Sequence, residues 1–148
     1  MSIILYLFYA ILTIACVRQF LRLLLSLSYN FNRKHNQLVT YPKISIIVPA
    51  YNEEKTICAC LQSLKNLDYP NYEVVVVDDG STDRTFEMAS QCRTAKVIRQ
   101  KNMGKPNALN NGVLAADGEI ILTVDADTTI DRHALRWIAA RFEVNKRL

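Results

Sequence analysis

The sequence predicts an α/β domain built on a doubly wound, mostly parallel sheet, preceded by one N-terminal apolar helix. From Lys43 onward, strand-like and helical patterns alternate four times along the chain. The strand-like runs are almost unbroken valine and isoleucine, which is typical of strands buried on both faces, and the helices between them indicate right-handed crossovers. The length of 148 residues, with 50% hydrophobic and 22% charged residues, suits one globular domain.

The N-terminal segment is expected to anchor the chain in a membrane. Residues 3–17 carry no charge, and the apolar pattern continues to Leu27 past Arg18 and Arg22. A membrane-spanning helix needs about 20 apolar residues, so both arginines would extend towards one interface. A buried core helix is the alternative, but a core would not accommodate two arginines on one face. The positive charges follow the apolar run, which differs from a signal peptide and predicts a cytoplasmic domain.

These patterns divide the chain into three parts. Residues 1–28 form the predicted transmembrane helix in the inner or plasma membrane, residues 29–42 form a polar linker, and residues 43–148 form the domain. The formal charge is +4, but the basic residues form no single stripe, so nucleic acid is not an expected partner. Reduced cysteines are expected, because Cys58-Ala-Cys60 lacks the spacing of a zinc site.

Periodicity and turn residues predict the elements of the domain. Asn52 is expected to cap the first helix, on whose apolar stripe Cys60 falls. Pro106 suits the first turn of the third helix, because its missing N–H needs no partner there. The predicted strands cover 44–49, 72–79, 96–100 and 119–127, and the predicted helices cover 53–67, 85–92, 106–116 and a last stretch around 135–142.

Acidic side chains follow three of the predicted strands, and a lysine follows the other. Ligands of an open parallel sheet bind beyond the carboxyl ends of its strands, so these residues are expected to meet at one rim. Like charges disfavour each other's ionised forms unless a cation or a donor compensates. Mg²⁺ or Mn²⁺, bound by one or two carboxylates and by substrate phosphates, would compensate them, and the lysine would meet the remaining phosphate charge. The pattern predicts a nucleotide-diphosphate site made by Tyr51, Glu53, Asp78, Asp79, Lys105, Asp125 and Asp127.

Each motif has a plainer alternative when it is taken alone. The acidic pair and the Gly-Ser-Thr-Asp that follows it are typical of a turn and helix cap, and Asp-x-Asp is a frequent solvated loop. A P-loop ATPase is excluded, because no Gly-x-x-x-x-Gly-Lys-Ser/Thr pattern surrounds Lys105. A receiver domain would carry its paired acids after the first strand, and a nucleotidyltransferase would carry a glycine-rich loop there.

The most specific functional signal is a set of four segments in a fixed order. They read ISIIVPAYNEEKTICACLQSL, YEVVVVDDGSTDRT, NMGKPNALNNG and EIILTVDADT. Together they closely resemble the processive, membrane-bound family 2 glycosyltransferases, such as poly-N-acetylglucosamine, hyaluronan and cellulose synthases. The resemblance covers about residues 43–131, and it implies a GT-A fold, which is Rossmann-like, and a UDP-sugar donor. The implied activity is that of a hexosyl- or N-acetylhexosaminyltransferase in polysaccharide biosynthesis.

The resemblance also implies roles for the residues after the first two strands. Tyr51 and Glu53 would line the uridine pocket. One residue of the acidic pair would meet the uracil edge, and of Asp78 and Asp79 we favour Asp79. These roles are carried over from the family's motifs, position by position.

The residues after the other two strands would face the diphosphate and the metal. In the family's pattern, Lys105 would face the base or the diphosphate, and Asp125 would lie near the ribose or the metal-bound phosphate. Asp125 and Asp127 would bind Mg²⁺ or Mn²⁺. Such enzymes use the metal as a Lewis acid that stabilises the departing diphosphate.

The chain departs from the family in lacking a catalytic base. Inverting members carry a Thr-Glu-Asp-like motif after the donor half, and processive members add Gln-x-x-Arg-Trp; neither occurs before Leu148. We therefore expect a donor-binding half of a truncated or split glycosyltransferase, inactive alone, whose remainder would bind the glycan acceptor. The alternative is a non-catalytic, membrane-tethered module that binds a nucleotide sugar or a partner.

Overall fold

The computed structural model describes residues 2–31 and 41–145 and confirms the predicted α/β class. The chain divides into two units, residues 1–37 and 38–148. Most of the segment predicted as a linker, residues 29–42, lies outside the described residues.

The first unit contains one helix, α1 (Ser2–Phe31). The helix ends three residues beyond the predicted boundary at residue 28. Among the described residues, no helix is long and apolar enough to cross a membrane. The membrane-spanning segment expected over residues 1–28 stays a prediction.

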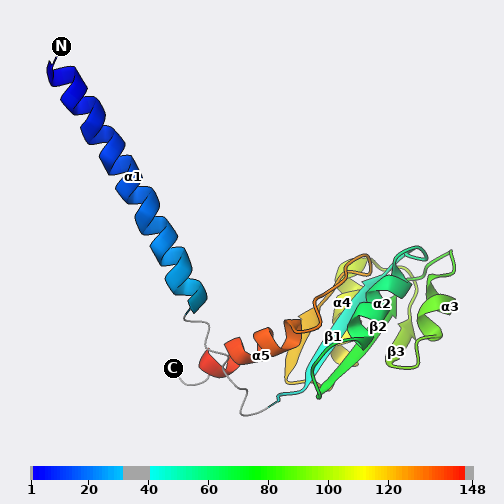
Figure 1. Cartoon of the computed structure of the whole chain (residues 1–148). Coiled ribbons are helices and arrows are strands. Elements are labelled where there is room, and N and C mark those ends of the chain that lie inside the picture. The colour runs from blue at the N-terminus through cyan, green and yellow to red at the C-terminus, as the bar shows by residue number, and fades with distance from the viewer. Residues whose placement is uncertain (1, 32–40, 146–148) are drawn as a thin grey trace. The chain divides into compact units, whose positions relative to one another are not determined.

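The second unit is a four-stranded parallel sheet with a helix after each strand (Figure 1). The strand order is β3-β2-β1-β4, so the chain runs outward through β2 and β3 and then returns to the other side of β1. β1 pairs along its whole length with β2, and its first four residues pair with β4. The elements are β1 (Ile44–Ala50), α2 (Ile57–Lys65), β2 (Tyr72–Asp78), α3 (Thr85–Ser90), β3 (Ala95–Arg99), α4 (Lys105–Leu114), β4 (Ile120–Thr123) and α5 (Ala134–Asn145).

Helices cover both faces of this sheet. Apolar residues of α2, α3 and α5 pack with one set of alternating strand residues, including Ile46 and Val76. α4 packs with the other set, in which Ile47, Val75 and Val77 surround Ala108. All seven residues of β1 are buried, as the valine and isoleucine run predicts for a central strand.

The predicted helix starts are right in one case and wrong in another. Pro106 lies in the first turn of α4, as predicted. Asn52 does not cap α2, which begins only at Ile57 after Thr56. Asn52 instead adopts a left-handed backbone conformation with φ of 56° and accepts hydrogen bonds from Thr82. The reason is tertiary, since the loop after β1 is bound to the loop after β2.

At the amino end of the sheet, a buried serine is satisfied by an acidic side chain. Ser45 on β1 is fully buried, donates to Glu73 on β2 and accepts a hydrogen bond from Gly118 N. The Glu73 carboxylate also accepts from Asp117 N at 2.7 Å and lies 3.5 Å from the Lys43 ammonium. Burial raises the pKa of Glu73, but the Ser45 and Asp117 hydrogen bonds and the Lys43 charge lower it by more, so the net pKa falls below its ordinary value.

The depressed pKa of Glu73 makes stability sensitive to acid. The ionised form is favoured in the folded state, so this contribution is present above the unfolded pKa of about 4.3 and is lost as the pH falls through the folded pKa. Glu73→Gln keeps an acceptor oxygen but cannot titrate. We expect its unfolding free energy, measured in urea from pH 2.5 to 6, to fall less steeply than that of the wild type. Glu87→Gln, at an exposed position of α3, should keep the wild-type slope.

Gly112 allows α4 to approach the sheet closely. A Cβ atom at this position would lie 2.3 Å from Ile47 Cγ2 and 3.3 Å from Val77 Cγ2. Both neighbours are fully buried, so neither has room to withdraw. The small residue is therefore required by packing rather than by backbone conformation.

Gly112→Ala should destabilise the domain, although alanine is the better helix former. Overpacking costs about 1–3 kcal/mol, which exceeds the gain in helix propensity of about 1 kcal/mol. Asn110→Ala, at an exposed position of the same helix, is the control and should change stability by no more than about 0.5 kcal/mol. Chemical denaturation measures both, and an alanine at position 112 that stabilises the domain would contradict this packing argument.

Candidate functional site

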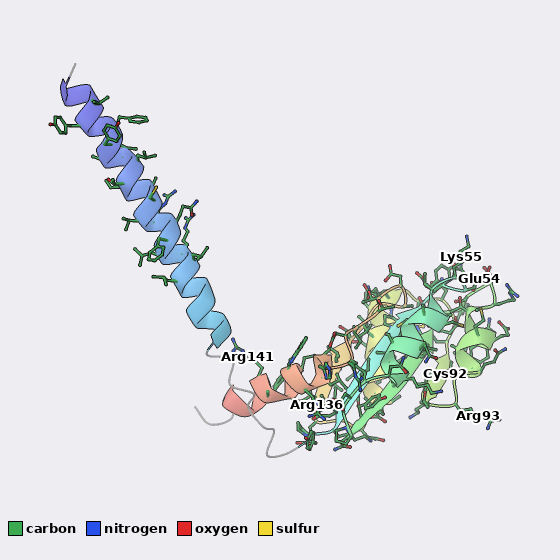
Figure 2. The ribbon with its side chains drawn as sticks, in the orientation of Figure 1. Glu54, Lys55, Cys92, Arg93, Arg136 and Arg141 are labelled. Atoms are coloured by element: carbon green, nitrogen blue, oxygen red, sulfur yellow. The ribbon has the colours of Figure 1, made fainter. Side chains whose placement is uncertain are left out.

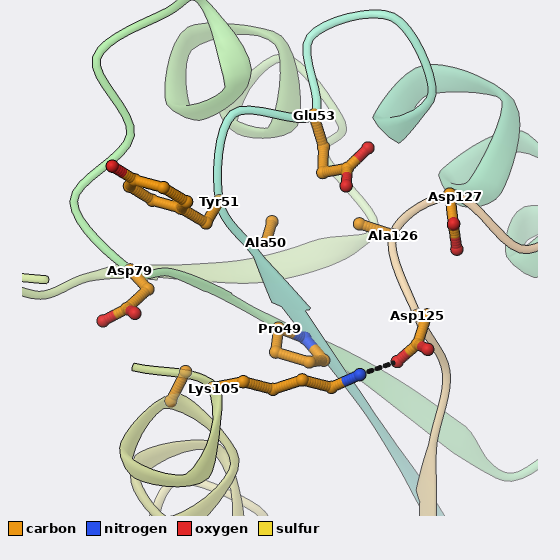
Figure 3. Close-up of a pocket in the computed structure, with 10 residues that line it drawn as sticks. Pro49, Ala50, Tyr51, Glu53, Asp79, Lys105, Asp125, Ala126 and Asp127 are labelled. Atoms are coloured by element: carbon orange, nitrogen blue, oxygen red, sulfur yellow. Dashed lines mark hydrogen bonds and ion pairs between the residues drawn. The ribbon is translucent and has the colours of Figure 1, made fainter. Parts of the chain in front are cut away.

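A pocket of about 240 Å³ lies at the carboxyl end of β1, beside the start of α4 and the segment after β4 (Figure 3). It lies where the strand order reverses around β1, which is the usual ligand position in open parallel sheets. Its charged groups are four carboxylates and one lysine. The residues that line it are Pro49, Ala50, Tyr51, Glu53, Asp79, Lys105, Ala108, Asp125, Ala126 and Asp127.

The structure brings six of the seven predicted site residues to this pocket and leaves Asp78 out. Asp78 ends β2, and its side chain is fully buried. Its Oδ1 accepts a hydrogen bond from Ser81 N, and Arg99 Nε lies 3.2 Å from its Oδ2, within ion-pair distance but without hydrogen-bond alignment. Successive strand residues point to opposite faces, which separates Asp78 from Asp79.

Asp79 borders the pocket with its carboxylate held by the loop that precedes α4. Oδ1 accepts hydrogen bonds from Gln100 Nε2 at 2.7 Å and from Met103 N at 2.9 Å, and Oδ2 accepts one from Gly104 N at 2.8 Å. The expectation that an external cation compensates the acidic pair is therefore wrong for both members. Protein donors stabilise Asp79, and Arg99 stabilises Asp78. Because Lys105 follows Gly104, Asp79 also fixes where α4 begins.

The remaining charges of the pocket are exposed. Lys105 Nζ donates to Asp125 Oδ1 at 2.7 Å, and both side chains are more than half exposed. Asp127 is exposed and accepts one long hydrogen bond, 3.3 Å from Thr128 Oγ1. Among the described residues, Asp127 has no ion-pair partner. The lysine thus neutralises Asp125 but leaves the charge of Asp127 uncompensated.

The loop after β1 contributes an aromatic ring and a fourth carboxylate. Tyr51 is 47% exposed, and its ring borders the pocket in Figure 3. Glu53 Oε2 accepts a hydrogen bond from Thr56 Oγ1 at 2.5 Å, which orients the carboxylate in the pocket wall. Glu54 and Lys55, the next residues, lie at the carboxyl end of the sheet (Figure 2).

Cys60 contacts the backbone of the segment that carries Asp125 and Asp127. It is buried on the apolar face of α2, as predicted, and all four cysteines are free thiols. Its Sγ lies 3.7 Å from the carbonyl oxygen of Asp125, a weak hydrogen bond. Burial, followed by the negative charge of Asp127, raises the pKa of the Cys60 thiol to about 11.

The protein alone does not assemble a full metal coordination shell. Among the side chains that the structure describes, no three of His, Cys, Asp or Glu lie close enough together to hold a metal ion. Asp125 and Asp127 offer two carboxylates on one short segment, next to the pocket. Such a pair can contribute at most part of a shell that other ligands complete.

Sequence reasoning missed the residues that bind the loop after β1 to the loop after β2. Ser81, Asp83 and Thr85 accept hydrogen bonds from backbone amides about 30 residues earlier. These residue types signal local turns and caps, so the sequence predicts only a local role for them. No local pattern indicates a partner so far along the chain.

Comparison with known families and proteins gives one consistent result. The family described as "Glycosyl transferase family 2" matches residues 45–147. The poly-β-1,6-N-acetyl-D-glucosamine synthase of Staphylococcus epidermidis is 35% identical over 109 residues, which cover 71% of this chain and 26% of that protein. The chain therefore spans about a quarter of the length of this curated relative.

Solved structures show the same fold. Staphylococcus aureus TarS 1–349 in complex with UDP-GlcNAc is 40% identical with a TM-score of 0.65, over 69% of this chain and 31% of that one. The mannosyltransferase PcManGT from Pyrobaculum calidifontis, in complex with GDP-Man and Mn²⁺, is 32% identical with a TM-score of 0.64, over 68% of this chain and 32% of that one.

Asp79→Asn should destabilise the domain more than Asp125→Asn. The NH₂ group of asparagine would face one of the N–H groups that now donate to the Asp79 carboxylate. A buried donor left without an acceptor costs about 1–3 kcal/mol. Asp125 loses only an exposed ion pair, worth at most about 1 kcal/mol. Urea unfolding at pH 7 compares the two, and equal losses would refute the structural role of Asp79.

Proposed function

The chain belongs to glycosyl transferase family 2, and on this basis we propose that its second unit binds the UDP-sugar donor of a glycosyltransferase. The observation that carries the proposal is the single pocket wall formed by Tyr51, Glu53, Asp79, Lys105 and the Asp125–Asp127 segment. The TarS structure with bound UDP-GlcNAc, at 40% identity, supports a uridine nucleotide as the ligand.

The nucleoside is assigned to the side of the pocket formed by the loops after β1 and β2. The half-exposed ring of Tyr51 offers a flat apolar surface for the base, and Glu53 lines the same side. Asp79 Oδ2 accepts one hydrogen bond from the described residues, so a further lone pair is available for the N–H of a uracil ring. The donors from the loop before α4 fix that oxygen in place.

The diphosphate is assigned to the side formed by Lys105 and the segment after β4. The Lys105 ammonium lies within the pocket wall and is already held by Asp125 at 2.7 Å. A phosphate would compete with this carboxylate for an exposed lysine, and an exposed ion pair is weak enough to be exchanged. Freed from Lys105, Asp125 would be available to a cation.

The residues present fit a divalent cation of the Mg²⁺ or Mn²⁺ type. Asp127 is exposed and forms no ion pair with a described lysine, arginine or histidine. Asp125 lies two residues away. These cations are commonly held by one or two carboxylates together with substrate phosphates, so the absence of a third protein ligand is compatible with a metal. When bound, the metal would act as a Lewis acid towards the leaving diphosphate.

Transfer of the sugar is proposed for a polypeptide longer than the matched region. The chain spans about a quarter of its relative, so the glycan acceptor site and the general base of an inverting reaction are assigned to the part that it does not span. The runner-up is a module that binds a nucleotide sugar without transferring it. Release of free sugar from UDP-GlcNAc by the purified chain would argue against that alternative.

The metal assignment predicts how Asp127 responds to nucleotide. With Mn²⁺ present and UDP at 100 times its dissociation constant, binding should stabilise the wild-type chain by about 2.7 kcal/mol. Asp127→Ala should abolish the Mn²⁺-dependent part of this protection, measured as the shift in melting temperature. Glu87→Gln removes one exposed acidic charge from α3 and should retain full protection. Equal protection of wild type and Asp127→Ala would remove Asp127 from the metal site.

The same melting-temperature assay tests which nucleobase the pocket selects. GDP should protect the wild type less than UDP at equal concentration if the pocket selects uridine. Greater protection by GDP would replace the uridine assignment by guanosine, the nucleoside of the donor in the PcManGT complex.

A further inference from the structure

Three consecutive backbone amides after β1 are bound by side chains of the segment after β2. Asn52 N donates to Ser81 Oγ at 3.0 Å, Glu53 N to Thr85 Oγ1 at 2.7 Å, and Glu54 N to Asp83 Oδ2 at 3.1 Å. None of the three acceptors lines the pocket. The course of the loop after β1 is thus set by side chains from outside the site.

Thr85 and Asp83 form the centre of this arrangement. Thr85 is fully buried, and its hydroxyl donates to Asp83 Oδ1 at 2.5 Å. The only hydroxyl proton is therefore used on Asp83, which leaves the oxygen lone pairs to accept from the Glu53 amide. Asp83 Oδ1 also accepts from Thr85 N at 3.0 Å, so the carboxylate is held from both sides.

The charge state of Asp83 agrees with this geometry. Burial raises its pKa, but the hydrogen bonds from Thr85 and from the Glu54 amide lower it by more, so the net pKa lies below its ordinary value. The carboxylate is ionised at neutral pH and accepts all of these bonds. It can therefore orient the Thr85 hydroxyl throughout the physiological range.

The bound amides flank the side chains that face the pocket. Asn52 is held in the left-handed region, with its Oδ1 accepting from Thr82 N at 2.9 Å. Asparagine tolerates this conformation better than most residues, and the turn it makes directs its neighbours Tyr51 and Glu53 to the pocket wall (Figure 3). If the amides were released, both side chains would lose their fixed position.

We propose that Thr85 and Asp83 are positioning residues for donor binding, which hold the Glu53 and Glu54 amides and so aim Tyr51 and Glu53 into the pocket. This inference rests on the proposed function, because it assigns a purpose to the pocket wall. The two residues touch no ligand themselves. Their effect is on how well the nucleoside side of the pocket is preorganised.

The test compares Thr85→Val with Thr85→Ser in the full 148-residue chain. Valine matches the shape of threonine but offers no acceptor to the Glu53 amide, whereas serine keeps the hydroxyl. Two quantities are measured: amide hydrogen exchange by NMR at Glu53 and in β2, and the dissociation constant for UDP by calorimetry with Mn²⁺. Ser90→Ala is the matched control, because Ser90 is exposed on the same helix and its hydroxyl donates to Phe86 O, within that helix.

In Thr85→Val, the Glu53 amide should exchange at least tenfold faster, while Val75 in β2 keeps its protection. The dissociation constant for UDP should rise about fivefold, because ordering the released loop on binding would cost about as much free energy as one hydrogen bond. Thr85→Ser should restore both values, and Ser90→Ala should leave both unchanged. If Thr85→Val does not fold, Asp83→Asn carries the test, with faster exchange expected at Glu54 and the same weakening of UDP binding.

The outcomes separate this inference from the proposed function. A wild-type chain that does not bind UDP overturns the proposed function and this inference with it. A wild type that binds UDP, together with a Thr85→Val chain whose Glu53 amide is released but whose affinity is unchanged, overturns the positioning role alone.

Discussion

The parallel pairing of β1 on both of its edges is the constraint on which the rest of the structure depends. With β2 on one side and β4 on the other, three strands end at the same rim, and all seven residues of β1 are buried between the helical layers. α4 follows β3 and returns across the sheet, so its first turn also reaches this rim. Gly112 makes that return possible by allowing close contact with Ile47. The pocket is thus a product of topology.

The aspartates around the rim fall into two groups with different physical roles. Asp78, Asp79 and Asp83 are held by partners within the protein, namely Arg99, the loop before α4 and Thr85. Their charges fix the backbone on which the site is built. Asp125 and Asp127 are exposed and are held weakly or not at all by described residues. Negative charge that is available to a ligand is therefore concentrated after β4, not after β2.

The sequence predicted the fold class, all eight elements of the domain and the convergence of the site, because valine and isoleucine runs, Pro106 and strand-end acids are local signals with a general meaning. It did not predict where α2 begins or which partners the acidic pair has. Those depend on contacts such as Glu53 N to Thr85 Oγ1, between residues 32 positions apart. Polar loop residues carry no mark of a distant partner, so their tertiary role became visible only with the structure.

Cys60 connects the buried face of α2 to the segment that carries Asp125 and Asp127. Burial alone would raise the pKa of the thiol, and Asp127 raises it further, towards about 11. Because the thiol remains protonated at neutral pH, it continues to donate to the Asp125 carbonyl and to support the segment that carries both carboxylates. The apolar core on this face of the sheet thus supports the segment whose two exposed carboxylates are available to a cation.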